Sequence, residues 1–379
     1  MSGIPESKHK RVVYVYDKQL SEECDKIPNI RGRAILVHNL IKSYGLLSQM
    51  QLKQICLANE EDLVSFHSRD YINFLQKMDN CNDIEKHEED QLEFGLSYDC
   101  PMIEGIYKFV QTIAGASLTS ARLLVDGSAD IAINWCGGWH HAQRDEAEGF
   151  CYVNDAVLAI HKLRERFERV LYIDLDLHHG NGVENAFAYT PHVFTLSLHK
   201  FEPGFYPGSG SLDDVGFGRG KFHAVNVPLK DGVRDKAYMQ IFQQIASKIH
   251  SVFQPNAIVM QCGCDGLNGD PQGAFNLTAT GMTSCVEYIL SWQIPTLFLG
   301  GGGYHLPNAA RCWTLLTAAI LGRKICSAIP EWNPDFLHYS PDFEIDITAG
   351  NRSDTNSTTD LQNIMRTINE RLDQIQVLS

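Results

Sequence analysis

Long hydrophobic runs are missing from this chain of 379 residues. Its apolar stretches are short and end in Gly, Asp or His, whereas a membrane-spanning helix needs about 20 apolar residues. No signal-peptide pattern opens the chain at MSGIPESKHKR. We therefore expect an intracellular protein that does not associate with membranes.

Basic residues are also scarce, since 32 Lys and Arg stand against 46 Asp and Glu, for a formal net charge of -14. Nucleic-acid binding requires clustered cations that replace phosphate counterions, so we expect no direct binding of nucleic acid and favour cationic partners. The short cluster KHKR at 8–11 could be a nuclear localisation signal, but a solvated arm is the favoured interpretation. Residues 1–11 are therefore predicted to form a flexible arm.

The sequence shows no sign of a disulfide framework and no linker that would divide the chain into domains. The 11 cysteines are scattered and odd in number, and a chain of this length needs no disulfide staples. No internal repeat and no Pro- or Gly-rich linker occurs, while 44% of the residues are hydrophobic and can bury a large core. We predict a single domain over residues 12–379.

What the chain does have is a regular alternation of strand and helix patterns. Helical periodicity occurs at 155–167, where Asp155 is the expected cap, at 237–253, and in a final amphipathic segment at 361–375 that should pack on the body of the protein. Such alternation predicts an α/β fold, a doubly wound parallel sheet of about eight strands flanked by helices. The runs that read as strands are 12–16, 130–135, 169–177, 192–199, 224–229, 256–264 and 295–303.

Four of these predicted strands run into unusual polar chemistry, in the segments CGGWHH, DLHHGNG, CDG and GGGGYH. In open α/β sheets, ligands bind beyond the carboxyl ends of the strands. The period of two along a strand would place Asp174, Asp176 and His178 on one face. Buried carboxylates without a positive partner cost several kcal/mol each, so a bound cation is expected there.

A divalent metal held by Asp176, His178 and Asp265 satisfies this expectation, although ordinary ion pairing is the competing interpretation of an isolated Asp-x-His pair. Three protein ligands leave a position open for water, which is typical of catalytic sites. Zinc suits this ligand set, and iron(II) stays open as the alternative.

The neighbouring polar residues then acquire catalytic interpretations. His140 and His141 can act on a water molecule as bases, and Asp174 can orient one of their rings. The phenol of Tyr304 follows a flexible glycine run and can donate to a developing oxyanion. The combination predicts metal-assisted hydrolysis of an amide or ester.

With these motifs assembled, the chain resembles the zinc-dependent histone deacetylases of class I over nearly its whole length. The segments that carry the resemblance are INWCGGWHHAQRDEAEGFCYVND, LYIDLDLHHGNGVENAF, SLHKFEPGFYPGSG, QCGCDGLNGDP and LGGGGYHLPNAARCWT. The resemblance implies an arginase/deacetylase-like fold and hydrolysis of the acetyl amide of N6-acetyl-lysine, with release of acetate. It also implies acetylated histone and non-histone protein tails as partners, a role in chromatin and transcriptional repression, and a location in nucleus and cytoplasm.

The resemblance also implies roles for individual residues. Asp176, His178 and Asp265 would bind zinc, His141 would be the general base with His140 as its electrostatic partner, and Tyr304 would polarise the carbonyl. Phe150, Phe205 and Tyr206 would wall a tunnel for the acyl-lysine stem, with Asp99 and Gly149 binding the peptide and its amide, and Arg33 lining an acetate channel. Structural K+ or Na+ would bind at Asp174, Asp176, His178, Ser197 and Leu198, and at a second site around Phe187, Thr190, Val193 and His223.

Four positions depart from the pattern of the family, among them Tyr206, which adds a hydroxyl to the tunnel wall where a close relative has Phe. Asn181 stands where class I members usually carry Asp, which should make protonation of His141 less favourable. Gln272 replaces Met or Leu at the tunnel rim, where a polyamine deacetylase branch has Glu. Cys264, beside a predicted ligand, is interpreted as a small buried residue rather than a second thiolate ligand.

Other functions remain open at this point. A deacylase of longer acyl-lysines or of acetylpolyamines is the main alternative, and a catalytically silent acetyl-lysine scaffold or an arginase-like manganese hydrolase are weaker ones. The chain ends without the long tail of other class I members, so we do not expect stable membership in a large corepressor assembly. We expect a protein that can act as a monomer.

Overall fold

The computed structural model describes residues 10–375 except 80, 82 and 83. Its centre is an eight-stranded sheet in the order β2-β1-β3-β8-β7-β4-β5-β6, in which all neighbouring strands are parallel. The predicted α/β sheet is thus confirmed. The strands are β1 Val12–Val15, β2 Gln51–Lys53, β3 Ile131–Asn134, β4 Val170–Asp174, β5 Val193–Lys200, β6 Ala224–Leu229, β7 Ala257–Gln261 and β8 Thr296–Leu299.

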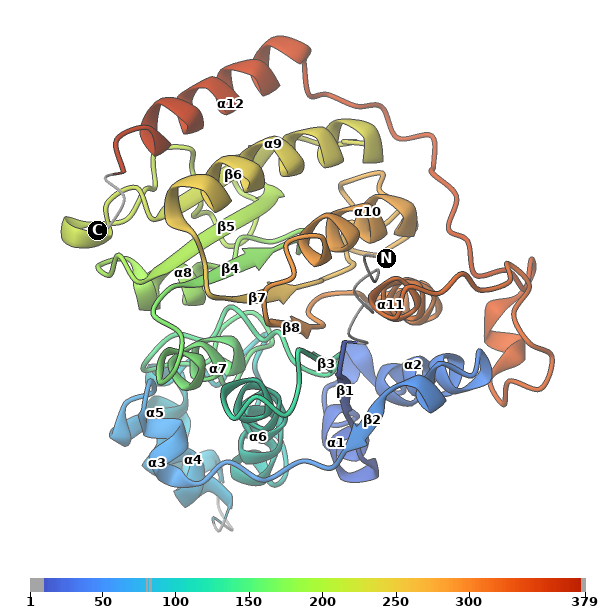
Figure 1. The fold of residues 1–379 in the computed structure, drawn as a ribbon. Helices are drawn as coiled ribbons and strands as arrows, with labels where there is room; N and C mark the ends of the chain where they lie inside the picture. Colours follow the sequence, from blue (N-terminus) through green and yellow to red (C-terminus); the bar gives the residue numbers. More distant parts are fainter. Residues whose placement is uncertain (1–9, 80, 82–83, 376–379) are drawn as a thin grey trace, which may run out of the picture.

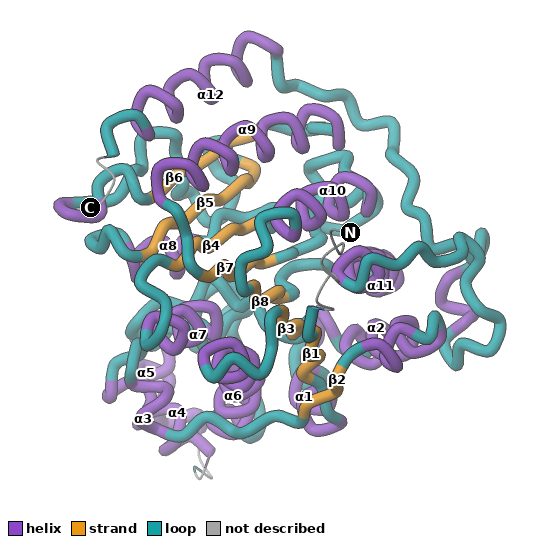
Figure 2. The backbone as a smooth tube through the Cα atoms, in the orientation of Figure 1, coloured by secondary structure: helices purple, strands orange, loops and turns teal. Residues whose placement is uncertain are grey.

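Helices cover both faces of this sheet, as Figures 1 and 2 show. Side chains along each strand alternate between the two faces, so Leu171 and Ile173 of β4 join one hydrophobic cluster while Val170 and Tyr172 join the other. Burial on both faces explains why the strands are apolar throughout. The first face carries α2 Arg33–Ser43, α9 Asp235–Phe253, α10 Ala279–Leu290 and α11 Leu306–Ile320, and the second carries α6 Ile106–Val125, α7 Asp155–Arg164 and α8 Asn181–Phe187.

The remaining helices form outer layers. The predicted C-terminal helix is α12, and its buried Ile368 and Leu372 join the cluster that contains α9, so it packs on the body as expected. These elements are α1 Lys18–Cys24, α3 Glu60–Val64, α4 Arg69–Asp79, α5 Glu88–Glu93 and α12 Thr358–Leu372, with the 3-10 turns Pro28–Ile30, Leu46–Gln49, Ile84–His87, Gly218–Gly220 and Phe336–Tyr339.

Two local expectations are corrected by the structure. Asn154, not Asp155, caps α7, because its side chain accepts a hydrogen bond from the backbone N–H of Val157. The predicted strand 169–177 ends early, since β4 stops at Asp174. The residues that follow therefore belong to a loop at the carboxyl end of the sheet.

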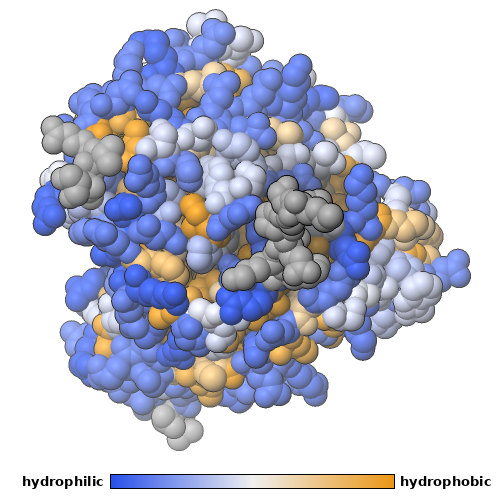
Figure 3. Space-filling view, in the orientation of Figure 1, coloured by the Kyte–Doolittle hydropathy of each residue, from blue (hydrophilic) through white to orange (hydrophobic). Residues whose placement is uncertain are grey.

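The surface agrees with the acidic, polar composition. Hydrophilic residues cover most of the face seen in Figure 3, with hydrophobic residues in scattered patches. No helix within the described residues is long and apolar enough to cross a membrane. Residues 1–9 of the predicted arm lie outside the described part of the chain, and the next residues bind the body through Lys10 Nζ to Leu290 O and Arg11 to Asp130.

Candidate active site

The polar segments singled out in the sequence follow four strands that are neighbours at the centre of the sheet, β3, β8, β7 and β4. Because these strands are parallel, the loops after them meet at one edge. Asp176 and His178 lie in the loop after β4 and not on a strand face, so the period-two argument for their placement was wrong. The loop nevertheless brings both side chains to the carboxyl end of β7, where Asp265 lies.

Asp176, His178 and Asp265 form a compact buried group whose potential ligand atoms all lie within 4.8 Å of one another. His178 Nδ1 is 3.0 Å from Asp265 Oδ2 and 3.3 Å from Asp176 Oδ1. The other oxygen of each carboxylate is held by the protein. Asp176 Oδ2 accepts from Gln261 Nε2 and from the backbone N–H of Gly302, both at 2.8 Å, and Asp265 Oδ1 accepts from the backbone N–H of Leu177 at 2.9 Å.

This arrangement fits a divalent cation. One oxygen of each carboxylate and one imidazole nitrogen converge, while protein donors fix the orientation of both carboxylates from behind. Burial and the nearby Asp176 carboxylate raise the pKa of Asp265 to about 7, as expected where two carboxylates share a site. A cation would relieve this repulsion. Cys264 is buried beside the group, as predicted, with its thiol 3.4 Å from Gly302 O.

Backbone approaches the group so closely that side chains are excluded from part of the glycine run. A Cβ at Gly302 would lie 2.3 Å from Asp265 Oδ2, which no real side chain tolerates. Gly301, with φ of 130°, adopts a conformation that favours glycine. The glycine run therefore serves to bring main-chain donors to the carboxylates.

The two histidines of the loop after β3 form a hydrogen-bonded relay. His140 Nδ1 is 2.7 Å from Asp174 Oδ2, which also accepts from the Tyr172 hydroxyl at 2.7 Å. The Nε2 atoms of His140 and His141 are 3.0 Å apart, and His141 Nδ1 is 2.8 Å from Asn181 Oδ1. Asp174 thus holds a ring in place, as its position in the sequence suggested.

The environments of His140 and His141 shift the pKa values of the two imidazoles in opposite directions. Burial alone would lower the pKa of His140, but the carboxylates of Asp174 and Asp176 outweigh it and raise the pKa to about 9. Burial lowers the pKa of His141 well below its ordinary value, and the positive charges of His140 and His178 lower it further. Neighbouring groups whose pKa values are pushed apart in this way are typical of acid–base pairs.

A pocket opens above these groups. Its outer part is lined by Asp99, Gly149, Phe150, Tyr206 and Gln272, together with His141, His178 and Tyr304. Phe150 and Gly149 occupy a tight turn between Glu148 and Cys151 and have φ of 65° and 55°. Phe205 is not among the lining residues. Its ring stacks instead on His178, with the ring centroids 5.3 Å apart.

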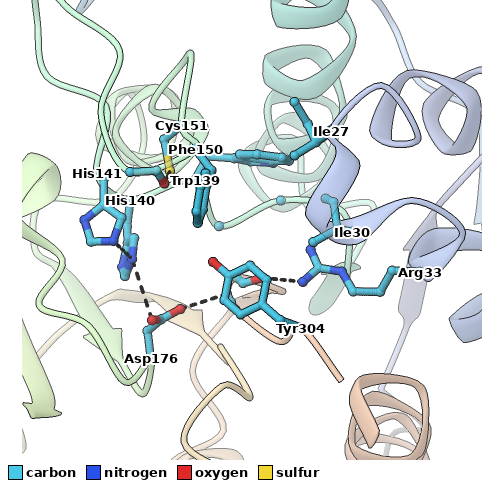
Figure 4. A pocket seen from close by; sticks show the side chains of 15 residues that line it. Ile27, Ile30, Arg33, Trp139, His140, His141, Phe150, Cys151, Asp176 and Tyr304 are labelled. Carbon is cyan, nitrogen blue, oxygen red and sulfur yellow. Dashed lines mark hydrogen bonds and ion pairs between the residues drawn. The ribbon is translucent and has the colours of Figure 1, made fainter. Parts of the chain in front are cut away.

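Tyr304 also lines the inner part of this pocket, whereas Asp99 lines only its outer part. The backbone N–H of Tyr304 donates to Asp270 Oδ2 at 2.7 Å, and Figure 4 shows its hydroxyl pointing toward the side occupied by His140, His141 and Phe150. Burial and the carboxylates of Asp265 and Asp176 raise the pKa of Tyr304 well above its ordinary value, which keeps the phenol protonated. At the exposed rim, Asp99 Oδ2 accepts from the backbone N–H of Gly149 at 2.8 Å.

The pocket continues inward to Arg33 (Figure 4). Arg33 Nη1 donates to the carbonyls of Gly301 at 3.0 Å and Gly303 at 2.9 Å, and the guanidinium lies 4.9 Å from the centroid of the Trp313 ring. A second, smaller cavity adjoins it, lined by Tyr14, Cys24, Trp135 and Cys136 among others. The side chain predicted to line an anion channel therefore faces internal space.

The residues predicted to bind monovalent cations also fall into two neighbourhoods. Asp174 pairs in register with Ser197 of β5, and its Oδ1 accepts from the backbone N–H of Asp176 at 3.1 Å. In the second set, the carbonyl of Phe187 accepts from Thr190, Val193 begins β5, and the carbonyl of His223 accepts from Thr195 of that strand. Binding of K+ or Na+ at either place stays a prediction.

Three residues of the site were missed in the sequence. Gln261 holds Asp176, and a polar residue ending an apolar run was a signal for it. The Asp155 carboxylate accepts from Gly138 N at 3.0 Å and from Trp139 N at 2.8 Å, which fixes the loop before His140. Glu148 contacts Asn181 and Tyr206, and no feature of its spacing predicts that.

A ligand substitution tests the metal group directly. Replacing Asp265→Asn should weaken binding of added Zn2+ by at least about 100-fold, because the amide removes one of two anionic ligands. Cys264→Ala is the matched control at the adjacent position and should bind Zn2+ like the wild type. Isothermal titration of protein stripped of metal measures both; equal affinity of Asp265→Asn and the wild type would contradict the assignment.

Comparison with known proteins places this site in a family. Residues 28–320 match the model of the histone deacetylase domain. The chain is 48% identical to histone deacetylase 8 of Xenopus tropicalis over 364 residues, which are 96% of this chain and 98% of the frog protein. It is 47% identical to histone deacetylase 8 of Danio rerio over 374 residues, covering 99% and 98% of the two chains.

A second group of relatives is somewhat more distant. Histone deacetylase 1 of Homo sapiens is 43% identical over 367 residues, which are 96% of this chain and 75% of the human protein. The range matched by the family model, 28–320, includes all the segments that carry the resemblance. The chain belongs to the histone deacetylase family, in the class I branch that its motifs predict.

Proposed function

We propose that this protein hydrolyses the acetyl amide of N6-acetyl-lysine in histone and non-histone protein tails and releases acetate. Membership of the histone deacetylase family makes the chain a lysine deacetylase. The observation that carries the finer proposal is the convergence of the His140–His141 relay and the Asp176, His178 and Asp265 group on the floor of one aromatic pocket.

We propose Zn2+ as the cation of this group, with Fe2+ as the alternative. When bound, such a cation lowers the pKa of water and polarises a carbonyl. His141 accepts the proton of the attacking water, since its lowered pKa keeps the imidazole neutral and the residue lines the pocket. The phenol of Tyr304 donates to the oxygen on which negative charge develops, and the cationic neighbour His140 favours the same charge.

The pocket accounts for the substrate. Phe150 and Tyr206 present aromatic faces on which the methylene stem of lysine can pack. Asp99, which lines the outer pocket, would accept backbone N–H groups of the peptide, and Gly149 would bind its amide. Arg33 offers a buried cation for the acetate product. The residues of the two predicted cation sites would hold structural K+ or Na+.

The alternatives are less well supported. The neutral Gln272 at the rim lacks the charge that would attract a polyamine, and a silent scaffold would not need the intact relay and Tyr304. Only one metal-ligand group of three occurs among the described residues, which disfavours a two-metal arginase-like enzyme. By family membership we further propose a chromatin role in transcriptional repression, action in nucleus and cytoplasm, and function as a monomer.

Removing the Tyr304 hydroxyl tests the proposed oxyanion donor. Tyr304→Phe should lower kcat on an acetyl-lysine peptide by about 10² to 10³-fold with a smaller change in KM, because the lost hydrogen bond strengthens in the transition state. The comparison is steady-state kinetics of the two zinc-loaded proteins. Unchanged kcat would show that the phenol does not act on the reacting carbonyl.

The pH profile tests the role of Asn181 beside His141. His141 must be neutral to accept a proton, so kcat/KM falls as pH drops through its pKa. Burial lowers that pKa most, His140 and His178 lower it further, and the hydrogen bond to Asn181 and the Asp176 carboxylate raise it. Asn181→Asp adds a negative charge at Nδ1 of His141 and raises that pKa, so the lower limb should move to higher pH by about one unit.

The control for this shift is Asn185→Asp, which adds the same charge on α8 where the side chain contacts Gln143 and not His141. The acidic limb of the pH profile of Asn185→Asp should lie at the same pH as that of the wild type. Equal limbs in Asn181→Asp and the wild type would refute the role assigned to Asn181.

Rim selectivity depends on the charge at position 272. Gln272→Glu should raise the ratio of kcat/KM for acetylspermidine to that for an acetyl-lysine peptide by about threefold, the scale of an exposed ion pair. Gln272→Leu should leave acetylspermidine disfavoured. Identical ratios in the two variants and the wild type would rule out Gln272 as a selectivity residue.

A further inference from the structure

Glu148 is the centre of a hydrogen-bond network beside the proposed base. Its Oε1 accepts from Asn181 Nδ2 at 2.9 Å and from the Tyr206 hydroxyl at 3.0 Å, and its Oε2 accepts from Gln143 Nε2 at 2.7 Å. All three donors are neutral. The carboxylate is therefore held next to the site by groups that satisfy its oxygens without cancelling its charge.

The first of these contacts fixes the orientation of Asn181. A side-chain amide has one face that accepts hydrogen bonds and one that donates them, and it can turn over unless its neighbours decide. An ionised carboxylate only accepts, so Glu148 requires the NH2 group of Asn181 on its side. The amide oxygen must then face His141, where it lies 2.8 Å from Nδ1.

The oriented amide in turn selects the tautomer of His141. A carbonyl oxygen accepts, so Nδ1 of His141 carries the proton and Nε2 keeps its lone pair, which can accept from His140 Nε2 at 3.0 Å. An aspartate at 181 would enforce this tautomer by itself, because both of its oxygens accept. An asparagine supports the same tautomer only while its amide oxygen faces Nδ1, and the hydrogen bond to Glu148 keeps the amide in that orientation.

We propose that Glu148 is a positioning residue of this deacetylase, which selects the reactive tautomer of His141 by holding the amide of Asn181. The inference rests on the proposed function, in which His141 is the base. It makes Glu148 and Asn181 together the equivalent of the single carboxylate usual at position 181 in class I sequences.

The same carboxylate braces the tunnel. Glu148 begins the tight turn that presents Phe150, through its paired backbone hydrogen bonds with Cys151 of 3.0 and 2.8 Å. Its side chain reaches the hydroxyl of Tyr206 on the other wall, and a Cβ at Gly149 would lie 2.5 Å from that hydroxyl. Tyr206 is thus tied back against the turn rather than left free at the mouth.

A charge-relocation experiment tests the proposal on the full-length, zinc-loaded protein. Glu148→Ala frees the amide of Asn181 and should lower kcat by at least about 10²-fold, since a wrong histidine tautomer costs up to about 10⁴-fold in other hydrolases. Glu148→Ala combined with Asn181→Asp should regain at least about tenfold of that loss, because the new carboxylate holds Nδ1–H without help.

Two further variants make the comparison specific. Glu146→Ala removes an exposed carboxylate two residues away and should stay within about twofold of the wild type. Asn181→Asp alone places a second carboxylate against Glu148, where a 2.9 Å hydrogen bond now lies. Because the two negative charges repel each other, this variant should melt at a lower temperature than the double variant, which lacks Glu148. Melting curves for every variant separate loss of catalysis from loss of fold.

A loss of activity alone would not distinguish this inference from a failure of the proposed function. The second measurement is therefore the NMR signal of the Nδ1–H proton of His141. That signal is assigned by its absence from the spectrum of His141→Ala. The downfield signal should disappear or shift in Glu148→Ala, return in the double variant, and persist in Glu146→Ala. An unchanged signal in Glu148→Ala, or a double variant no more active than Glu148→Ala, would overturn the proposal. A wild type without deacetylase activity would refute the proposed function, and the NMR signal would still decide the role of Glu148.

Discussion

The burial of negative charge at the carboxyl edge of the sheet is the constraint on which the site depends. The residues Asp174, Asp176 and Asp265 are each at most 1% exposed to solvent. Burying a carboxylate without hydrogen-bond or charged partners would cost free energy at each of these positions. Asp174 is satisfied by an imidazole and a phenol, and the other two by main-chain and amide donors on one side. Their other oxygens converge with the imidazole of His178 on a group that could hold a metal ion.

Much of the remaining architecture supplies those partners. Four adjacent parallel strands bring their loops to a common edge, glycines allow main-chain N–H groups to reach the carboxylates, and Gln261 fills the space between β7 and the loop after β4. The helices bury both faces of the sheet up to this edge. The relay of His140 and His141 is then aligned by groups that belong to the same packed core.

The sequence predicted the fold and the metal group well because both depend on local patterns. Apolar runs marked seven strands, but β2 escaped since Gln51–Lys53 is polar and largely exposed at the edge of the sheet. Asp176 and His178 were assigned to the right site for a wrong reason, because apolar alternation continues beyond the last ladder hydrogen bonds of β4. Glu148 could not be found, since its contacts join segments 33 and 58 residues apart.

The turn that carries Phe150 supplies an aromatic side chain to the pocket but lowers the stability of the fold. A bulky residue with φ of 65° is held in a conformation that costs roughly 1 to 2 kcal/mol relative to glycine. A sequence shaped by folding alone would place glycine there and lose an aromatic wall of the tunnel. The positive φ at Phe150 is therefore the conformational cost at which this turn keeps an aromatic side chain in the lining of the pocket.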